Sequence, residues 1–287
     1  MALTDKTKEW IKKNASVDLT GKTVLITGAN SGVGYKTAET MIYLGAAVIM
    51  ACRNPVKAKE AMDKLCTEYP DANIQLMQLD LGDFASVEAF AESLPDVDVF
   101  VNNAGTLHHP NEKTKDGYPL VIGTNYFGVV KLCEAILPRL YSFGHDVMLI
   151  NTISISHKMT TVDYERFYED KGSYARSKLC LARYTNGLVE RCKGTNVHVY
   201  MNHTGMAITP IAAHMFGTLY RFAKWFPINS AEKSSLSVAW LMAHNTLEGS
   251  VVGPNKIFGG WGYPEINKTC KRAIVGIKEL MESILSH

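Results

Sequence analysis

The sequence lacks several features that would assign it to a specialised class of protein. Its 30 basic and 28 acidic side chains are scattered along 287 residues and leave a net charge of +2, so no block of charge indicates a nucleic-acid partner. The six cysteines include no Cys-x-x-Cys pair, and the nine histidines fit no metal-ligand spacing, which favours reduced, mostly buried thiols and no metal site. Residues 1–14 are polar and rich in lysine, unlike a secretory signal or a transmembrane span. These absences predict a cytoplasmic protein.

The composition suits one globular domain. Hydrophobic residues make up 46% of the chain and charged residues 20%, and no linker, repeat or low-complexity tract divides it. From residue 22, short apolar, β-branched runs alternate with longer helix-like stretches. Such alternation is typical of an α/β protein, and we expect a single doubly wound (Rossmann) parallel sheet of about seven strands with helices on both faces. The expected strands are residues 23–27, 47–51, 74–79, 97–101, 147–152, 197–202 and 256–258.

Three segments lie outside this alternation. Residues 1–20 are expected to form an amphipathic, helical N-terminal extension of a cofactor-binding domain spanning residues 21–287. Residues 204–229 carry Gly, Pro and many apolar aromatic side chains, which indicates a lid over a lipophilic substrate or a shallow peripheral contact with a membrane; ordinary core packing explains them equally well. Residues 265–285 have the pattern of an amphipathic helix that closes the domain or an interface, so a homodimer is compatible with the sequence.

A glycine-rich turn directly follows the first expected strand. Three residues separate Gly28 from Gly32, one residue separates Gly32 from Gly34, and a helix is expected next. A backbone that turns here can bring its amides and the positive end of the helix against a pyrophosphate; a plain strand-to-helix turn is the simpler interpretation. We predict a dinucleotide site to which this turn contributes Gly28, Asn30, Ser31, Gly32, Val33 and Gly34.

The ends of the next strands indicate which dinucleotide is bound. The second strand ends at Arg53 and offers no acidic side chain for a ribose 2′-hydroxyl, whereas the planar Arg53 guanidinium can pair with a 2′-phosphate. This favours NADP(H) over NAD(H), unless Arg53 is only a solvated loop charge. At the end of the third strand, Asp80, beside Leu81, can accept from the adenine amino group or cap the next helix. Contacts to a ribose, or a plain structural turn, are expected at the residues after the fourth strand, Asn103, Ala104 and Gly105.

A tyrosine and a lysine that are four residues apart, Tyr174 and Lys178, stand further downstream. On a helix this spacing puts both side chains on one face, where the ammonium favours the ionised form of the phenol. Tyr220 and Lys224 have the same spacing, so the spacing alone does not choose between the two pairs. Ser154, which follows the fifth expected strand and stands 20 residues before Tyr174, selects the first pair.

Taken in order, these motifs resemble the short-chain dehydrogenase/reductase family, in its retinol dehydrogenase-like branch. The similarity covers about residues 20–262 and rests on the glycine turn, Asp80, Asn102 to Gly105, Asn125, Ser154 and Tyr174-x3-Lys178. The resemblance implies that Tyr174 is the general acid/base, that Lys178 lowers its pKa and binds the nicotinamide ribose, and that Ser154 binds the substrate oxygen. It also implies that Asn125 holds a water leading to Lys178, and that Thr209 contacts the carboxamide or pyrophosphate.

The sequence departs from the family pattern at three places. Ile153 stands where the first of two paired serines is usual, which leaves Ser156 as a second candidate for the reactive serine. Thr204 stands where a proline is usual, so the loop over the nicotinamide is expected to be less rigid. The stretch before the catalytic tyrosine is long, and it predicts an added wall of the substrate site that contains Tyr164, Phe167 and Tyr168.

Two functions stay open on these residues. The complete Ser–Tyr–Lys set predicts an NADP(H)-dependent oxidoreductase that transfers hydride between nicotinamide and a carbonyl or alcohol of a small lipophilic substrate, such as a retinoid, a steroid or a fatty aldehyde. The alternative is a non-catalytic NADP(H)-binding sensor or interaction protein on the same fold. Single residues also have structural alternatives, since Ser154 can cap the strand end and Asn125 can satisfy backbone groups within a helix.

Overall fold

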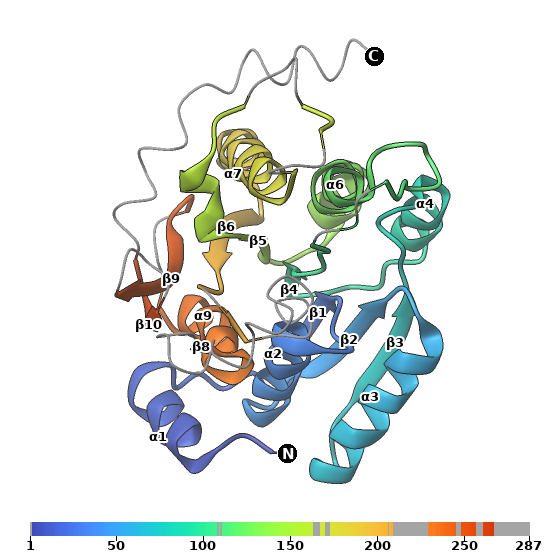
Figure 1. The fold of residues 1–287 in the computed structure, drawn as a ribbon. Coiled ribbons are helices and arrows are strands. Elements are labelled where there is room, and N and C mark those ends of the chain that lie inside the picture. Colours follow the sequence, from blue (N-terminus) through green and yellow to red (C-terminus); the bar gives the residue numbers. More distant parts are fainter. Residues whose placement is uncertain are drawn as a thin grey trace.

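The described part of the chain folds around one central sheet of eight strands (Figure 1). The computed structural model describes residues 2–107, 109, 111–162, 167–169, 173–205, 207–208, 229–244, 248–256 and 261–266. The strands lie in the order β10-β9-β6-β5-β4-β1-β2-β3, and neighbours are parallel except for β9 and β10. Their bounds are β1 Thr23–Thr27, β2 Ala47–Cys52, β3 Ile74–Gln78, β4 Val99–Asn102, β5 Val147–Ile153, β6 Val197–His203, β9 Val251–Lys256 and β10 Trp261–Ile266. The predicted fold class is confirmed.

The central strands are buried on both faces. Consecutive side chains of a strand point to opposite faces, yet Val24, Leu25 and Ile26 of β1 are each 0% exposed. A strand with two covered faces needs a continuous apolar run rather than an alternating one. The β-branched runs that predicted these strands therefore reflect burial between two layers of helices.

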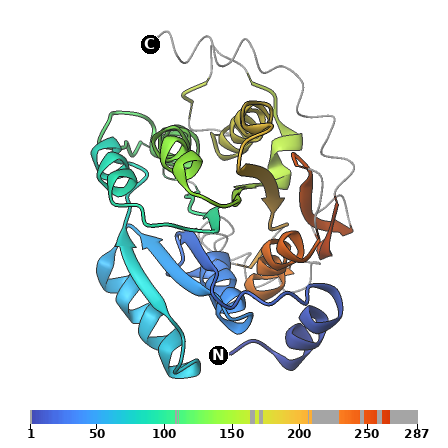
Figure 2. The same cartoon turned by 180° about the vertical axis from the view of Figure 1, so that it is seen from behind.

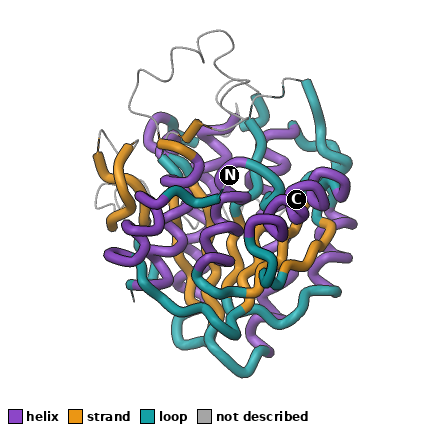
Figure 3. The backbone as a smooth tube through the Cα atoms, turned by 90° about the horizontal axis from the view of Figure 1, so that it is seen from below, coloured by secondary structure: helices purple, strands orange, loops and turns teal. Residues whose placement is uncertain are grey.

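Helices cover the sheet in two layers. Figure 1 shows α4, α6 and α7 on one side of the sheet and α2, α3 and α9 on the other. Figure 2 shows the same layers from behind, and Figure 3 shows the middle of the sheet between helices. Phe90, Leu132 and Leu188 belong to the core of the first side, and Met41 and Leu241 to that of the second. The helices are α1 Asp5–Asn14, α2 Gly32–Tyr43, α3 Pro55–Glu68, α4 Phe84–Glu92, α5 Leu120–Ile122, α6 Gly128–Ser142, α7 Ser173–Cys192 and α9 Ala231–Ala243, with a π-helix η1 Gly123–Phe127 and a 3-10 helix η2 Ile155–Met159.

The strand order reverses direction once, beside β1. From β1 the chain builds β2 and β3 outward on one side, then returns to place β4 on the other side of β1. In a doubly wound sheet, ligands bind at the carboxyl ends of the strands beside such a reversal. The turns after β1, β4 and β5 all open at this edge.

The last part of the sheet differs from the sequence-based prediction. The strand expected at residues 256–258 lies earlier, at Val251–Lys256, because Val251 and Val252 provide the buried apolar pair. Gly253 follows them, and a Cβ there would lie 2.4 Å from the His203 carbonyl oxygen, so this glycine permits a close approach of β9 to β6. Glu265 and Ile266, expected to begin a helix, instead end strand β10, paired antiparallel with β9; residues 267–285 of that helix lie outside the described residues.

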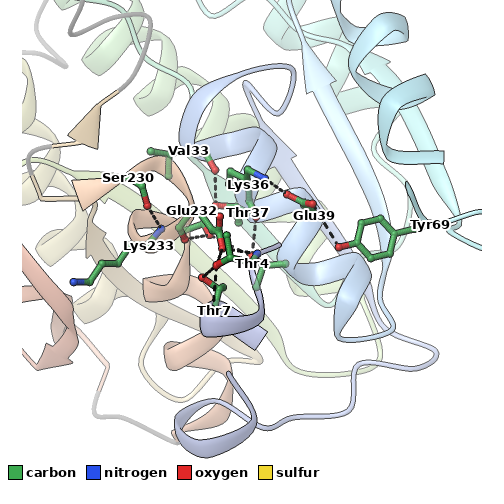
Figure 4. A network of polar contacts seen from close by, with 12 residues as sticks. Thr4, Thr7, Val33, Lys36, Thr37, Glu39, Tyr69, Ser230, Glu232 and Lys233 are labelled. Atoms are coloured by element: carbon green, nitrogen blue, oxygen red, sulfur yellow. Dashed lines mark hydrogen bonds and ion pairs between the residues drawn. The ribbon is translucent and has the colours of Figure 1, made fainter. Parts of the chain in front are cut away.

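The N-terminal helix α1 is fastened to elements from the other end of the chain (Figure 4). Thr4 donates to Glu232 Oε1 of α9 from its backbone nitrogen at 2.9 Å and from its hydroxyl at 2.7 Å. Trp10 stacks on Tyr263 of β10, with ring centroids 5.1 Å apart. A small buried cluster of Leu3, Ile11 and Leu236 lies beneath these contacts. The extension expected at residues 1–20 therefore contains a helix that covers α9 and β10.

One stretch of the described residues has the length and composition of a membrane-spanning helix. It runs from Leu120 to Ser142, through α5, η1 and α6, with a mean hydropathy of 1.5. In the fold, 61% of its apolar window is buried inside the protein. Burial of this kind is typical of a core helix in a globular domain, and α6 packs on the sheet in that way.

Candidate active site

The turn after β1 is tight and leads directly into the N-terminus of α2. Gly28 and Gly32 have φ values of +68° and +58°, which glycine adopts without strain. A Cβ on Gly34 would lie 2.4 Å from both the Gly28 oxygen and the Asn103 side chain, so α2 starts against the turn. Ser31 precedes α2 and makes no side-chain bond to its first amides. Asn30 lies in the turn and Val33 in the first turn of α2, so the predicted residues surround one helix N-terminus that suits an anion.

The turn after β4 is tied to the end of β1. The Thr27 hydroxyl oxygen accepts from the backbone nitrogens of Asn103 at 3.0 Å and Ala104 at 2.9 Å, and the Asn103 side chain donates to the Thr27 carbonyl at 2.9 Å. A Cβ on Gly28 would lie 3.0 Å from the Ala104 Cα. Both interpretations of this segment are therefore compatible: it is a structural turn, and it brings backbone next to the glycine turn.

The residues expected around the adenosine half lie at the same edge. Arg53 is exposed at the end of β2, and the adjacent Asn54 caps α3. Asp80 follows β3, and its Oδ1 accepts from the Gly82 backbone nitrogen at 2.9 Å. The suggestion that Asp80 caps the next helix is wrong, because Asp83 caps α4 by accepting from Ser86. The neighbouring Leu81 is buried, 4% exposed.

Ser154 begins a tight turn after β5. It is the N-cap of η2, and its Oγ accepts from the Ser156 backbone nitrogen at 3.3 Å. Its hydroxyl also lies close enough to the Tyr174 phenol to act on the pKa of that group. The strand-end cap that was the structural alternative is thus present, and the same hydroxyl reaches the predicted general acid. The Ser156 hydroxyl is buried and makes no hydrogen bond within the described residues.

Tyr174 and Lys178 stand on one face of α7, as their spacing predicts. The Lys178 ammonium lies 6.0 Å from the centroid of the Tyr174 ring and donates to the Thr152 carbonyl of β5 at 2.8 Å. Lys178 is 4% exposed, whereas Tyr174 is half-buried. The site therefore combines the Ser154 hydroxyl, directly after β5, with the Tyr174 phenol and the Lys178 ammonium on α7.

Burial dominates the pKa values at this site. It lowers the pKa of Lys178 to about 8. It also raises the pKa of the Tyr174 phenol, and the hydrogen bond from Ser154 opposes that rise. The lowered tyrosine pKa expected from the Lys178 charge is not found in the protein chain alone, because both groups are desolvated and the ammonium is bonded to the Thr152 carbonyl.

Asn125 sits in the π-helix η1 and is fully buried. Its Oδ1 accepts from the Thr106 nitrogen at 2.7 Å, and its Nδ2 donates to the Thr106 oxygen at 2.8 Å. The amide therefore satisfies backbone groups, as the structural alternative expects. A Cβ on Gly105 would lie 3.2 Å from Asn125 Oδ1 and 3.7 Å from Lys178 Nζ, so one glycine separates the two side chains. π-helices are rare and often occur at functional sites.

Aromatic side chains pack around Phe127, the last residue of η1. Phe167 and Tyr168, from the long stretch before α7, lie 6.1 Å and 6.4 Å from the Phe127 ring, and Tyr118 lies 4.5 Å from the same ring. Phe167 is 6% exposed and Tyr168 is 55% exposed. Phe167 and Tyr168, which the sequence predicts in a wall of the substrate site, thus form one aromatic cluster with Phe127. Tyr164 lies outside the described residues.

Other predicted residues cannot be placed in this site. Thr209, Tyr220 and Lys224, with most of the lid segment 204–229, lie outside the described residues. Within the part of the chain that the structure describes, no three His, Cys, Asp or Glu side chains gather as a metal site.

Several residues of the site were missed by sequence reasoning. Thr27 and Thr152 supply a hydroxyl and a carbonyl at the ends of β1 and β5, and Thr106 binds Asn125 through its backbone. The Cys52 thiol accepts from the backbone nitrogens of Ala29 and Asn30, beneath the glycine turn. Position at a strand end was the available signal for Thr27, Cys52 and Thr152, whereas backbone partners leave no mark on the sequence.

Comparison with known proteins agrees with this geometry. A family model described as short chain dehydrogenase matches residues 22–218. Retinol dehydrogenase 14 of Mus musculus is 32% identical over 92% of this chain and 87% of its own, and retinol dehydrogenase 12 of Homo sapiens is 32% identical over 69% of this chain and 66% of its own. An uncharacterised protein from Mycobacterium paratuberculosis has a similar structure, with a TM-score of 0.71 and 26% identity over 93% of this chain and 95% of that one.

The fold, the glycine turn and the extent of these matches define an oxidoreductase of the nicotinamide-dependent class, acting on CH–OH and carbonyl groups. The chain belongs to the short-chain dehydrogenase/reductase family, and within it to the retinol dehydrogenase-like group.

Proposed function

We propose that this protein transfers hydride between NADP(H) and a carbonyl or alcohol group of a small lipophilic molecule, with Tyr174 as the general acid/base. The observation that carries the proposal is geometric: Tyr174 and the buried Lys178 share one face of α7, with the ammonium 6.0 Å from the ring centroid, and Ser154 stands beside the phenol. These three side chains lie at the edge of the sheet where the glycine turn also opens. Retinol dehydrogenases with related sequences support the reaction class.

Each side chain has a separate task in this proposal. When bound, the nicotinamide cofactor supplies or accepts the hydride. Tyr174 Oη gives its proton to the carbonyl oxygen during reduction, or takes one from the alcohol during oxidation. The raised pKa of Tyr174 keeps the phenol protonated at neutral pH, which is the form that reduction needs. Ser154 donates to the same substrate oxygen and stabilises the charge that develops there.

Lys178 and Asn125 act behind the tyrosine. Since the Lys178 ammonium has three donors, the bond to the Thr152 carbonyl leaves two for a ribose hydroxyl or a water. We propose that Asn125, separated from Lys178 by Gly105, holds that water through a lone pair of its Oδ1. A proton given up by Tyr174 would then be restored from solvent through Lys178.

NADP(H) is proposed over NAD(H) because Arg53 is the exposed side chain at the end of β2. Related folds from Shigella flexneri and Escherichia coli were solved with NADP and NADPH, at TM-scores of 0.66 and 0.67. The replacement Arg53→Glu puts a carboxylate beside the 2′-phosphate, and we expect the KM for NADPH to rise about tenfold or more while that for NADH falls. The matched control is Lys64→Glu, which makes the same charge change at an exposed position of α3. An Arg53→Glu enzyme that still prefers NADPH would overturn the assignment.

The substrate is proposed to be a retinoid, a steroid or a fatty aldehyde. The names of the related retinol dehydrogenases and the aromatic cluster of Phe127, Phe167 and Tyr168 support an apolar substrate. We place the protein in the cytoplasm, in peripheral contact with membranes that dissolve such molecules. Co-sedimentation with phosphatidylcholine vesicles tests that contact, and recovery of all protein in the supernatant would contradict it.

The test of the reaction is turnover of a panel of retinal, medium and long-chain aldehydes and ketosteroids, first with NADPH and then with NADH. Cofactor oxidation is followed by absorbance and the alcohol product is identified by chromatography. We expect NADPH-dependent reduction of at least one apolar carbonyl, and its loss in Tyr174→Phe. Tight NADPH binding without any turnover across the panel would refute catalysis and favour a non-catalytic sensor on the same fold.

A further inference from the structure

We infer that His157 is a positioning residue for Ser154, fixing the turn that aims the serine hydroxyl at Tyr174; the inference rests on the role proposed above for Ser154. His157 belongs to η2 and is 1% exposed. Its backbone nitrogen donates to the Ser154 carbonyl at 3.1 Å, and its ring Nδ1 is hydrogen-bonded to the same oxygen. Two groups of one residue therefore bind one carbonyl.

The chemistry of this contact assigns the state of the ring. A carbonyl oxygen only accepts, so Nδ1 must carry the proton and donate. Burial lowers the pKa of His157, and the Lys158 charge lowers it further, whereas the hydrogen bond to Ser154 opposes both. The ring is therefore neutral, and its Nε2 carries no proton. Within the described residues, Nε2 has no hydrogen-bond partner. Among the described residues, the His157 ring therefore hydrogen-bonds through Nδ1 to the Ser154 carbonyl oxygen alone.

The turn holds Ser154 at two of its oxygen atoms. The Ser154 carbonyl is bound by His157, and the Ser154 Oγ accepts from the Ser156 nitrogen at 3.3 Å. The Oγ accepts from inside the turn, and the same hydroxyl acts on the Tyr174 phenol, whose pKa rise it opposes. Loss of the ring bond frees rotation of the Ser154 peptide group and moves the hydroxyl. A displacement of about 1 Å at a catalytic group can cost about 100-fold in rate.

Two near-isosteric replacements separate this role from packing. The Nδ2 of asparagine occupies the place of the histidine Nδ1, whereas the glutamine amide nitrogen corresponds to Nε2. We expect His157→Asn to retain most of the turnover, and His157→Gln and His157→Ala to lower kcat about 10- to 100-fold with the KM for NADPH unchanged. The control His145→Asn, at a half-buried site before the opposite end of β5, is expected to leave kcat unchanged.

A double-mutant cycle with Ser154→Ala tests whether His157 acts through the serine. We expect His157→Gln to cause no further loss of kcat in the Ser154→Ala background, because the hydroxyl that it positions is gone. Losses that multiply, or a His157→Gln enzyme as active as His157→Asn, would overturn the inference while the proposed function stands. Full turnover by Ser154→Ala would refute the proposed role of Ser154 and the inference with it. Unfolding midpoints of all variants, measured in parallel, identify any loss that reflects misfolding.

Discussion

Two strand ends open on the same edge of the sheet, and they are built differently. After β1, the turn contains three glycines, and it is so tight that a Cβ on Gly34 would lie 2.4 Å from the Gly28 carbonyl oxygen. After β5, the turn is held by side chains: the His157 ring binds the Ser154 carbonyl, and the Ser154 hydroxyl stands beside Tyr174 of α7. In the proposed function, the first turn binds the cofactor through its main chain, and the second acts through hydroxyl, imidazole and ammonium groups.

This difference decides which properties depend on pH. Main-chain amides do not titrate, so binding at the β1 turn is set by shape and by the fixed helix dipole. The β5 turn and the adjoining end of β6 bury Lys178, His157 and His203, whose pKa values all lie below their ordinary values because of burial. We therefore expect changes at the β5 side to affect rate and acid stability, and changes at the β1 side to affect affinity and packing.

The largest expected effect belongs to the proton donor on the β5 side. The replacement Tyr174→Phe removes the phenol hydroxyl and little volume, and we expect kcat to fall about 100- to 10,000-fold, the range for loss of a general acid. Binding of NADPH, measured by fluorescence titration, is expected to stay close to that of the wild type, because the glycine turn is untouched. A Tyr174→Phe variant with the kcat of the wild type would contradict the assignment of proton transfer to the β5 side.

The next effect concerns His203, at the end of β6. Burial lowers the pKa of His203 from 6.5 to about 3. Between these two pH values the unfolded chain binds a proton at His203 that the folded chain does not bind. Stability from this group is present above pH 6.5 and falls as the pH drops toward 3, by roughly 1.4 kcal/mol for each pH unit. In His203→Asn, which keeps an acceptor for the Gly205 nitrogen, we expect a flatter loss of unfolding free energy between pH 7 and about pH 5.

The matched control for His203 lies on the same strand. The Glu248 carboxylate raises the pKa of His198, so this contribution has the opposite sign: it is present at low pH and is lost as the pH rises. We expect His198→Asn to steepen the acid loss slightly rather than flatten it. Denaturant unfolding curves at both pH values check the two variants, and identical pH profiles for them would contradict the assignment to His203.

The smallest expected effect belongs to the β1 side. In Gly34→Ala, the new methyl group meets the Gly28 carbonyl, and we expect a loss of about 1–3 kcal/mol in unfolding free energy with weaker NADPH binding. Gly144→Ala is the control, since a Cβ there has no heavy atom within 4 Å, and a change within about 0.5 kcal/mol is expected. Urea unfolding and NADPH titration measure both. An undisturbed Gly34→Ala would show that the turn is less tightly packed than its geometry indicates.

The same contrast explains how far the sequence could predict the molecule. Glycine spacing and β-branched runs are local signals, so β1, at Thr23–Thr27, has its predicted bounds. Tyr174 and Lys178 share a face of α7 because four-residue spacing on a helix requires it. Their roles, like those of Asn125 and Arg53, stay predictions that activity measurements must test.

Contacts that depend on distant parts of the chain were not predicted. Lys178 bonds a carbonyl 26 residues away, and any residue at position 152 would offer one. The start of β9 was misplaced because Gly253 and Pro254 resemble a turn, whereas the glycine is needed for the approach of His203. Asp80 and Asp83 have equal capping propensity, and only the position of the first helical turn decides between them.

The attachment of α1 has a consequence for synthesis of the protein. Thr4 bonds Glu232, 228 residues further along the chain, and Trp10 stacks on Tyr263. At roughly 5–20 residues per second, a ribosome needs about 10 to 50 seconds to make the intervening chain. During that interval the apolar side of α1 has neither α9 nor β10 to cover it. The order of translation therefore delays the docking of α1 until α9 and β10 have been made, and Leu3 and Ile11 lack the cover of Leu236 until then.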